Sequence, residues 1–217
     1  MISNNLQEVR HTLDNGVCLV AVSKYHPVEA VREAYAVGQR IFGESREQEL
    51  RIKHDSLPKD IQWHFIGHLQ TNKVKYIAPY IAMIETVDSL KLMKEIDRQG
   101  AKCGRVIDIL LELHLAQEDT KSGMTPSDCL ALLDGGEWRE MRNIRIRGIM
   151  MMASNTDDTE EIRREFLLAR DFFNAVKAKH FANDTAFDTK SYGMSHDYLL
   201  AQQCGSNHVR VGSRIFG

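Results

Sequence analysis

Residues 15–43, NGVCLVAVSKYHPVEAVREAYAVGQRIFG, contain one complete unit of a strand followed by a helix. The Val-rich apolar run at 17–23 follows a turn-forming Asn-Gly pair and predicts a buried strand. Pro27 favours the first turn of a helix over 28–37, and a glycine follows where many helices end. The apolar run at 40–43 then predicts the next strand.

This unit recurs along the chain without a break in composition. We expect strands at residues 17–23, 40–43, 62–67, 81–87, 106–113, 144–151, 186–191 and 207–211. Helix signals separate them, the longest over 159–179. Alternating strands and helices favour a parallel sheet with right-handed crossovers, and eight such strands close into a TIM-type (β/α)8 barrel. An open doubly wound sheet is the main alternative, but no glycine-rich phosphate loop follows any expected strand.

The two ends of the chain add one feature to this barrel. Only the short segment 212–217 follows the eighth expected strand, so a crossover helix of normal length is missing there. The polar segment 4–13 has a helical pattern, and we expect it to cover that gap. We therefore expect one domain over residues 1–217, an α/β barrel with an additional N-terminal helix. Two further helices are expected to end at Gly100 and to begin with Ser195 as the N-cap.

The composition is that of an ordinary globular chain with little net charge. Hydrophobic residues make up 43% of it, and 28 basic against 30 acidic residues give a formal charge of -2. Such a chain has no net positive field to hold nucleic acid. Arg145 and Arg147 could form a local anion site, but alternating arginines on a strand are more often a solvated face.

Nothing in the sequence indicates export or insertion into a membrane. The N-terminal residues are polar, and no apolar stretch approaches the thickness of a bilayer. The four cysteines are far apart, so we expect reduced thiols. These features predict a soluble, cytoplasmic protein. We expect a monomer as well, because no sustained apolar stripe is left over for a large interface.

Functional groups of this type of barrel lie at the carboxyl ends of the strands. Lys24 stands at the end of the first apolar run, where its amine would point into the barrel mouth. Partial desolvation there lowers the pKa of a lysine and frees its amine for Schiff-base formation. A solvated surface lysine is the plainer interpretation of the same position.

Small residues at the ends of the last two strands indicate an anion site. Gly193-Met194-Ser195 follows the seventh strand and Gly212-Ser213 follows the eighth. The loops at these two positions form the recurrent phosphate cradle of the fold. A phosphate cradle that faces a lysine amine suits a phosphorylated aldehyde. Pyridoxal phosphate and the sugar phosphate of an aldolase both fit this description.

Arg210 favours pyridoxal phosphate. It lies between Val209 and Val211 on the eighth expected strand, so its side chain points away from theirs and, in a barrel, inward. An arginine is one of the recognised partners of the pyridine nitrogen of this cofactor. A structural arginine paired with a buried carboxylate is the alternative.

An ordered set of motifs across nearly the whole chain resembles the pyridoxal phosphate homeostasis protein family. The motifs are AVSK at 21–24, FGE at 42–44, QE at 48–49, WHFIGHLQ at 63–70, NK at 72–73, KSG at 121–123, RG at 147–148, GMS at 193–195 and VRVGS at 209–213. One position departs from the family pattern, because Ser45 stands where the family usually has Asn. The shorter serine hydroxyl would reach a ligand at that place only through water or a shifted loop.

The resemblance implies a barrel similar to the N-terminal domain of alanine racemase. It also implies a Schiff base with pyridoxal 5′-phosphate at Lys24, a phosphate site at Ser195, Gly212 and Ser213, and Arg210 near the pyridine nitrogen. The family controls vitamin B6 and linked amino-acid pools, with no established catalytic reaction. Enzymes that depend on pyridoxal phosphate and lack it are candidate partners of such a protein.

Two functions from different classes stay open, a cofactor carrier and an amino-acid racemase of the same fold; an aldolase is a third. We expect the carrier, because racemisation needs acid/base groups on both faces of the substrate and the sequence ends at Gly217 without a second domain. We expect no metal site. His64 and His68 have zinc-helix spacing but lie in an expected strand and its end. The methionines at 150–152 could line a cofactor pocket, but methionine at a strand end more often fills the core.

Overall fold

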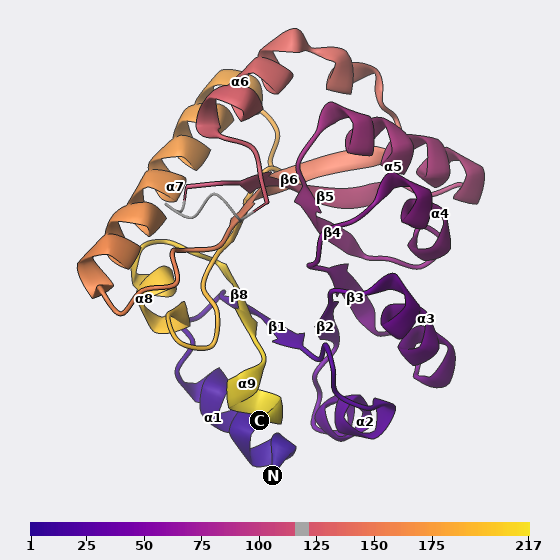
Figure 1. The fold of residues 1–217 in the computed structure, drawn as a ribbon, viewed down its shortest axis with the longest axis vertical. Helices are drawn as coiled ribbons and strands as arrows, with labels where there is room; N and C mark the ends of the chain where they lie inside the picture. Colours follow the sequence, from indigo (N-terminus) through magenta and orange to yellow (C-terminus); the bar gives the residue numbers. More distant parts are fainter. Residues whose placement is uncertain (116–121) are drawn as a thin grey trace.

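The computed structural model describes residues 1–115 and 122–217 and contains a closed barrel of eight parallel strands, β1 to β8, in sequence order (Figure 1). The strands are β1 (Cys18–Val22), β2 (Ile41–Glu44), β3 (Gln62–Phe65), β4 (Met83–Val87), β5 (Ile107–Leu113), β6 (Ile144–Met151), β7 (Thr189–Ser191) and β8 (His208–Val211). The expected (β/α)8 barrel and all eight of its strands are confirmed. Strand β7 is shorter than expected, because its first residues form a turn in which the Phe187 amide donates to the Asp184 carbonyl.

Helices surround this barrel, as Figure 1 shows. They are α1 (Ile2–His11), α2 (Val28–Ala36), α3 (Glu47–Ser56), α4 (Val74–Ile77), α5 (Leu90–Cys103), α6 (Pro126–Gly135), α7 (Thr159–His180), α8 (Tyr198–Gln203) and α9 (Ser213–Phe216), with 3-10 turns η1 (Thr71–Lys73) and η2 (Glu137–Glu140). The buried faces of these helices and the outward faces of the strands share one large apolar core.

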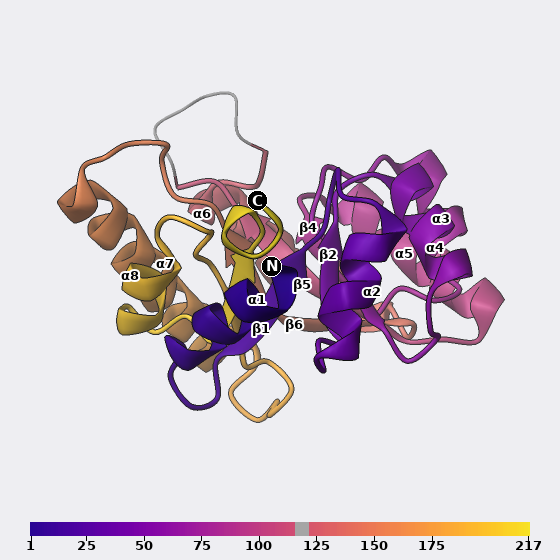
Figure 2. The same ribbon diagram turned by 90° about the horizontal axis from the view of Figure 1, so that it is seen from below.

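The chain termini lie together, since α1 packs against the short final helix α9 in both ribbon views (Figures 1 and 2). The Asn5 side-chain amide donates to the Ile215 carbonyl oxygen at 3.2 Å. The expected N-terminal helix is therefore confirmed, and it covers the place of the missing crossover helix. Figure 2 also shows that α9 lies at one end of the barrel and the turn before β7 at the other.

Helix α5 continues past the glycine that was expected to end it. It ends instead at Gly104, which has a left-handed φ of +63°. Gly100 lies inside the helix, where a Cβ atom would come within 2.8 Å of the Asn143 carbonyl oxygen. This glycine therefore serves close packing and not helix termination.

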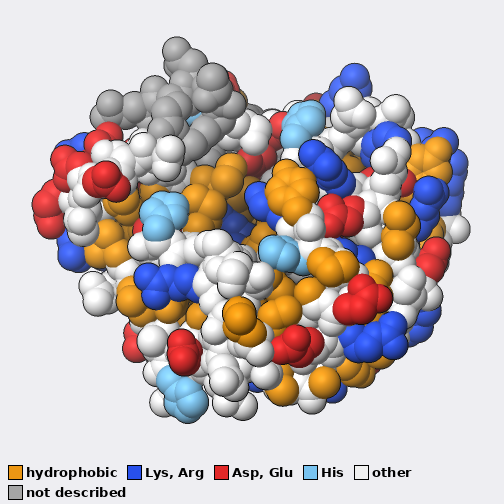
Figure 3. Space-filling view, turned by 60° about the horizontal axis from the view of Figure 1, so that its bottom comes forward, with side chains coloured by type: hydrophobic (Ala, Val, Ile, Leu, Met, Phe, Trp, Pro, Cys, Tyr) orange, Lys and Arg blue, Asp and Glu red, His pale blue; other side chains and the backbone are white. Residues whose placement is uncertain are grey.

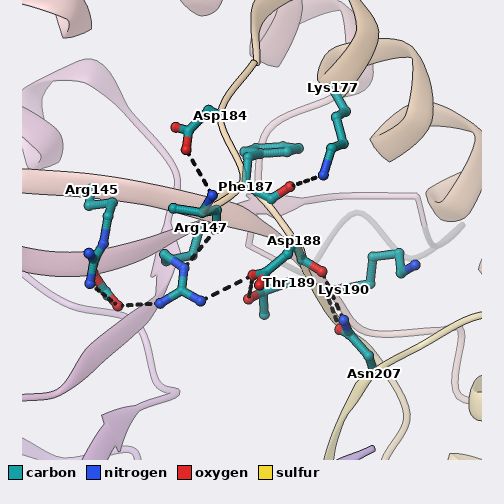
Figure 4. A network of polar contacts seen from close by, with 11 residues as sticks. Arg145, Arg147, Lys177, Asp184, Phe187, Asp188, Thr189, Lys190 and Asn207 are labelled. Carbon is teal, nitrogen blue, oxygen red and sulfur yellow. Dashed lines mark hydrogen bonds and ion pairs between the residues drawn. The ribbon is translucent and has the colours of Figure 1, made fainter. Parts of the chain in front are cut away.

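Arg145 and Arg147 lie on one solvent-facing side of β6, as expected, with side chains that are 51% and 24% exposed, but they do not form a free anion site. Both guanidinium groups bind Asp108, with N–O distances of 2.7 and 2.8 Å, and Arg147 also reaches Asp188 at 3.1 Å (Figure 4). These residues lie near the amino ends of β5, β6 and β7. The carboxylates of neighbouring strands neutralise the arginines, so the network joins three strands. It lies at the amino-terminal end of the barrel, which in this fold contributes stability, whereas the active site lies at the carboxyl-terminal end.

No helix in the described ranges has both the length and the apolar content required to cross a bilayer.

Candidate functional site

A pocket of about 300 Å³ opens at the carboxyl ends of β1 and β8. Its lining consists of Val22, Lys24, Ile66, Met152, Met194, Ser195, His196, Arg210, Gly212 and Ser213. All five residues expected to form the site are in this set: Lys24, Ser195, Arg210, Gly212 and Ser213. The space-filling view in Figure 3 shows a hollow near the centre of this face, where hydrophobic, basic and histidine side chains gather. The barrel thus brings together residues that are far apart in the sequence.

Lys24 lies in a turn directly after β1, which ends at Val22 and not at the serine that follows. Its side chain is partly buried, with the Nζ atom 5.8 Å from the centre of the Tyr25 ring. Tyr25 has a φ of +68°, a left-handed conformation that non-glycine residues seldom adopt. The backbone therefore changes direction sharply at Lys24 and Tyr25, just after the end of β1.

Ser195 joins the two loops at the ends of β7 and β8. Its hydroxyl oxygen accepts a hydrogen bond from the Gly212 amide at 3.0 Å. It does not cap α8, whose N-cap residue is Asp197 without a side-chain bond to the helix amides. The expected capping role was wrong, because the serine lies too far before the first turn and its hydroxyl binds the neighbouring loop.

Several backbone amides in these loops are left without acceptors. Within residues 1–115 and 122–217, the N–H groups of Ser195, His196, Ser213 and Arg214 donate to no backbone or side-chain oxygen. Gly212 brings its loop against β1, since a Cβ atom there would lie 3.1 Å from the Val22 carbonyl oxygen. Unpaired amides from two adjacent loops, around serine hydroxyls, can bind an anion of phosphate size.

Arg210 points inward from β8 and is only 4% exposed. Its Nη1 atom donates to the Ser191 hydroxyl at 2.6 Å, and its Nη2 atom donates to the Met151 carbonyl oxygen at 2.8 Å. Its nearest carboxylate is Glu85, at 3.8 Å. The arginine therefore makes the structural pairing that the sequence left open, and it also forms part of the pocket wall.

Glu85 holds this buried charge in place. Its side chain is fully buried and accepts hydrogen bonds of 2.6 Å from both the His64 ring and the Ser191 hydroxyl. Burial raises the pKa of Glu85, but the hydrogen bond and charge of His64, together with Arg210 and Ser191, lower it to about 2. The carboxylate is thus ionised at neutral pH and compensates Arg210 inside the barrel.

Several lining residues were not expected from the sequence. Val22 and Ile66 are apolar strand residues whose types do not distinguish a pocket from a core. Met150 and Met151 fill the core as expected, whereas Met152 is only partly buried and lines the pocket. The position of Met152 at the end of the expected strand was the available signal for its place in the pocket.

A second pocket of about 300 Å³ lies at the carboxyl ends of β2 and β3. Ser45, His68 and Lys73 line this second pocket and not the first. Lys73 Nζ lies 3.4 Å from a Glu47 carboxylate oxygen, so it is paired. Lys121, the other lysine of the family motifs, lies outside the described residues. The His64 ring lies in β3 and contacts Glu85, whereas His68 follows the strand and lines the second pocket.

A closed parallel barrel with a lysine after β1 and small-residue loops after β7 and β8 defines a class of protein. The family model for "Alanine racemase, N-terminal domain" matches residues 1–217. The chain is similar, at 15% identity and a TM-score of 0.78, to an alanine racemase of Clostridium difficile 630, covering 100% of this chain and 56% of that one. That likeness concerns the fold alone.

Closer relatives narrow the class. The chain is 34% identical to the pyridoxal phosphate homeostasis protein of Aquifex aeolicus over 94% of this chain and 88% of that one, and 38% identical to the protein of that name in Schizosaccharomyces pombe over 93% and 84%. It is 35% identical to PipY of Synechococcus elongatus PCC7942, solved with PLP bound, with a TM-score of 0.91 and full coverage of both chains. The chain belongs to the pyridoxal phosphate homeostasis protein family.

Proposed function

We propose that this protein binds pyridoxal 5′-phosphate in the pocket between β1 and β8 and serves vitamin B6 and amino-acid homeostasis without substantial turnover of amino acids. One observation carries the proposal. A lysine amine, unpaired backbone amides and a buried arginine line one cavity of about 300 Å³, a size that suits a small cofactor. The family names and the PLP-bound relative support the same ligand.

Lys24 is the proposed attachment site, through a Schiff base with the aldehyde that the cofactor supplies when bound. The turn after β1 directs this side chain into the pocket, where its amine lines the same cavity as the proposed phosphate loops. Lys73 is less suitable because it is paired with Glu47 and lines the second pocket.

The proposed phosphate anchor is the pair of loops after β7 and β8. The unpaired amides of Ser195 and Ser213 and the hydroxyl of Ser213 are donors available to an anion. These donors lie in the pocket wall with Lys24, so that one ligand could reach both. Backbone N–H groups carry partial positive charges and can bind a dianion without a cationic side chain.

Arg210 has two proposed roles. It would face the pyridine nitrogen, and its permanent charge would disfavour protonation of that nitrogen. A ring with an unprotonated nitrogen is a weak electron acceptor, so proton abstraction from an attached amino acid would be slow. The carrier function is preferred to the racemase alternative on this ground.

The further partners are also proposals. Release to enzymes that lack the cofactor would suit a pocket that is open to solvent. The protein would act as a monomer in the cytoplasm, because no sustained apolar stripe is left over for a large interface. Its charge balance does not favour a polyanion as a partner.

Titration with two ligands tests the proposal. We expect pyridoxal phosphate to bind with a change in visible absorption, and pyridoxal to bind at least about tenfold more weakly because it lacks the anchor. Ser213→Ala should weaken the first ligand and leave the second unchanged, whereas Ser56→Ala, at the exposed end of α3, should change neither. Equal affinity of the two ligands for the wild-type chain would contradict the proposed anchor.

A further inference from the structure

A buried ammonium group lies directly behind the turn that carries Lys24. Lys53, on α3, has a side chain that is 3% exposed. Its Nζ atom donates to the Ser23 carbonyl oxygen at 2.7 Å, to Glu44 at 2.7 Å and to Glu49 at 2.8 Å. An ammonium has three protons, so each of them has an acceptor. A cation buried so completely fixes the positions of its acceptors, because losing any of them leaves a buried charge short of a partner.

The same carboxylates also hold the turn itself. Glu44 accepts a hydrogen bond from the Ser23 hydroxyl at 2.6 Å, and Glu49 accepts one from the Tyr25 amide at 2.7 Å. Ser23 and Tyr25 are the two neighbours of Lys24 in the chain. Both are therefore tied to the buried ammonium, directly or through one carboxylate, while Lys24 between them faces the pocket.

Lys53, Glu44 and Glu49 together form a clamp on the turn, and the backbone at Tyr25 indicates why this clamp is needed. This residue has a φ of +68° and is the one non-glycine residue with a positive φ in the described parts of the chain. Strained conformations of this kind persist where the surroundings fix them, and they gather at functional sites. The carboxylate of Glu49 binds the amide of this residue, so the clamp acts at the strained position.

We propose that Lys53 and Glu49 are positioning residues that fix the direction in which the Lys24 amine enters the pocket. Neither side chain lines that pocket. Attachment to a ligand aldehyde needs the amine at a defined distance and angle, and small displacements of a reacting group slow such a step strongly. This inference rests on the proposed function for the identity of the ligand, although the clamp itself is a property of the unliganded chain.

Glu49 offers the sharper test, because removing Lys53 would leave the fully buried Glu44 without its cation and could unfold the chain. The Glu49 side chain is 23% exposed, so water can replace it at the Lys53 ammonium, and its loss should cost less stability than the loss of the fully buried Glu44. Glu49→Ala removes the acceptor of the Tyr25 amide, whereas Glu49→Gln keeps an acceptor oxygen at the same place. Asp55→Ala removes an exposed carboxylate of the same helix that contacts only His54 among the described residues.

Two measurements are made on each variant. Hydrogen exchange by mass spectrometry follows the peptide that covers residues 23–27 in the unliganded protein. The rate of attachment at Lys24 is measured by quenching with borohydride after mixing with pyridoxal phosphate. For Glu49→Ala we expect faster exchange in that peptide and attachment slowed by about tenfold or more. Glu49→Gln should restore both, and Asp55→Ala should match the wild type.

Attachment in Glu49→Ala at the wild-type rate, or equal slowing in Glu49→Ala and Glu49→Gln, would overturn the proposal. If the wild-type chain forms no adduct at all, the proposed function fails. Hydrogen exchange in the peptide of residues 23–27 then still tests whether the clamp fixes the turn. Faster exchange confined to Glu49→Ala supports the clamp, and unchanged exchange overturns it.

Discussion

Replacing Glu85 with Gln removes the negative charge at the centre of the barrel while keeping the shape of the side chain. Arg210 would then be buried without its carboxylate, 3.8 Å away in the wild type. Breaking one partner of a buried ion pair costs about 3–5 kcal/mol. We expect Glu85→Gln to lower the free energy of unfolding by that amount at pH 7.

The pKa of Glu85 gives a second estimate of the same quantity. It is lowered from 4.5 to about 2 in the folded chain, against the raising effect of burial. A depression of this size corresponds to roughly 3 kcal/mol of stability. Because the folded pKa is the lower one, this stability is fully present above pH 4.5 and is lost as the pH falls toward 2. The two estimates agree.

Urea denaturation followed by circular dichroism measures the effect at pH 7, pH 4 and pH 3. The gap between wild type and Glu85→Gln should narrow by roughly 2 kcal/mol between pH 7 and pH 3, because over this range the carboxyl takes up a proton in the unfolded chain while it stays mostly ionised in the folded chain. Glu137→Gln is the control, because Glu137 is 57% exposed beside Lys94 and its loss should cost at most about 1 kcal/mol. A Glu85→Gln gap below about 1 kcal/mol at pH 7, or one that does not change with pH, would refute this reasoning.

Three further predictions concern packing, protonation and chemistry. Gly148→Ala should destabilise the fold by about 3 kcal/mol or more in urea denaturation, since its Cβ would lie 1.8 Å from the Thr189 carbonyl oxygen, whereas Gly135→Ala, with open space at its Cβ, should be nearly neutral. Burial lowers the pKa of His208 to about 4, so its ring should remain neutral at pH 6 in an NMR titration. Because the unfolded chain takes up this proton first, the folded protein should lose stability as the pH falls from 6.5 toward 4. A ring that titrates near pH 6.5 would contradict this prediction. Single enantiomers of alanine should keep their optical purity for hours with the cofactor-loaded protein, and racemisation at about 1 per second or faster, lost in Lys24→Ala, would favour the racemase alternative.

The barrel could be predicted because its signal is repeated eight times. Short apolar runs with helix signals between them indicate a parallel sheet even where single boundaries are wrong. We expected no particular residue range for helix α3, and the reason is physical. Its buried residues include Glu47 and Lys53, so its inner face is charged and hydrophobic periodicity cannot detect it. A lysine that is buried against carboxylates from other elements looks in the sequence like any surface lysine.

The expected site residues came from strand ends and from a family resemblance, and the structure brings all five into one pocket. The details that escaped prediction are those that depend on tertiary contacts. Ser195 was expected to cap a helix, but its hydroxyl binds the Gly212 amide across two loops. Gly100 was expected to end a helix, but it allows close packing against Asn143. A local pattern shows which residue type stands at a position but not why. A serine can cap a helix or join two loops, and a glycine can end a helix or allow close packing.

Attachment at Lys24 is the central claim, and mass spectrometry tests it most directly. The protein is mixed with pyridoxal phosphate, reduced with borohydride and digested, and the modified peptide is sequenced. We predict one phosphopyridoxyl group on Lys24, and none in Lys24→Ala, which should keep the circular dichroism spectrum of the wild type. A group found on Lys73 or Lys121 instead, or adduct formation that persists in Lys24→Ala, would contradict the account.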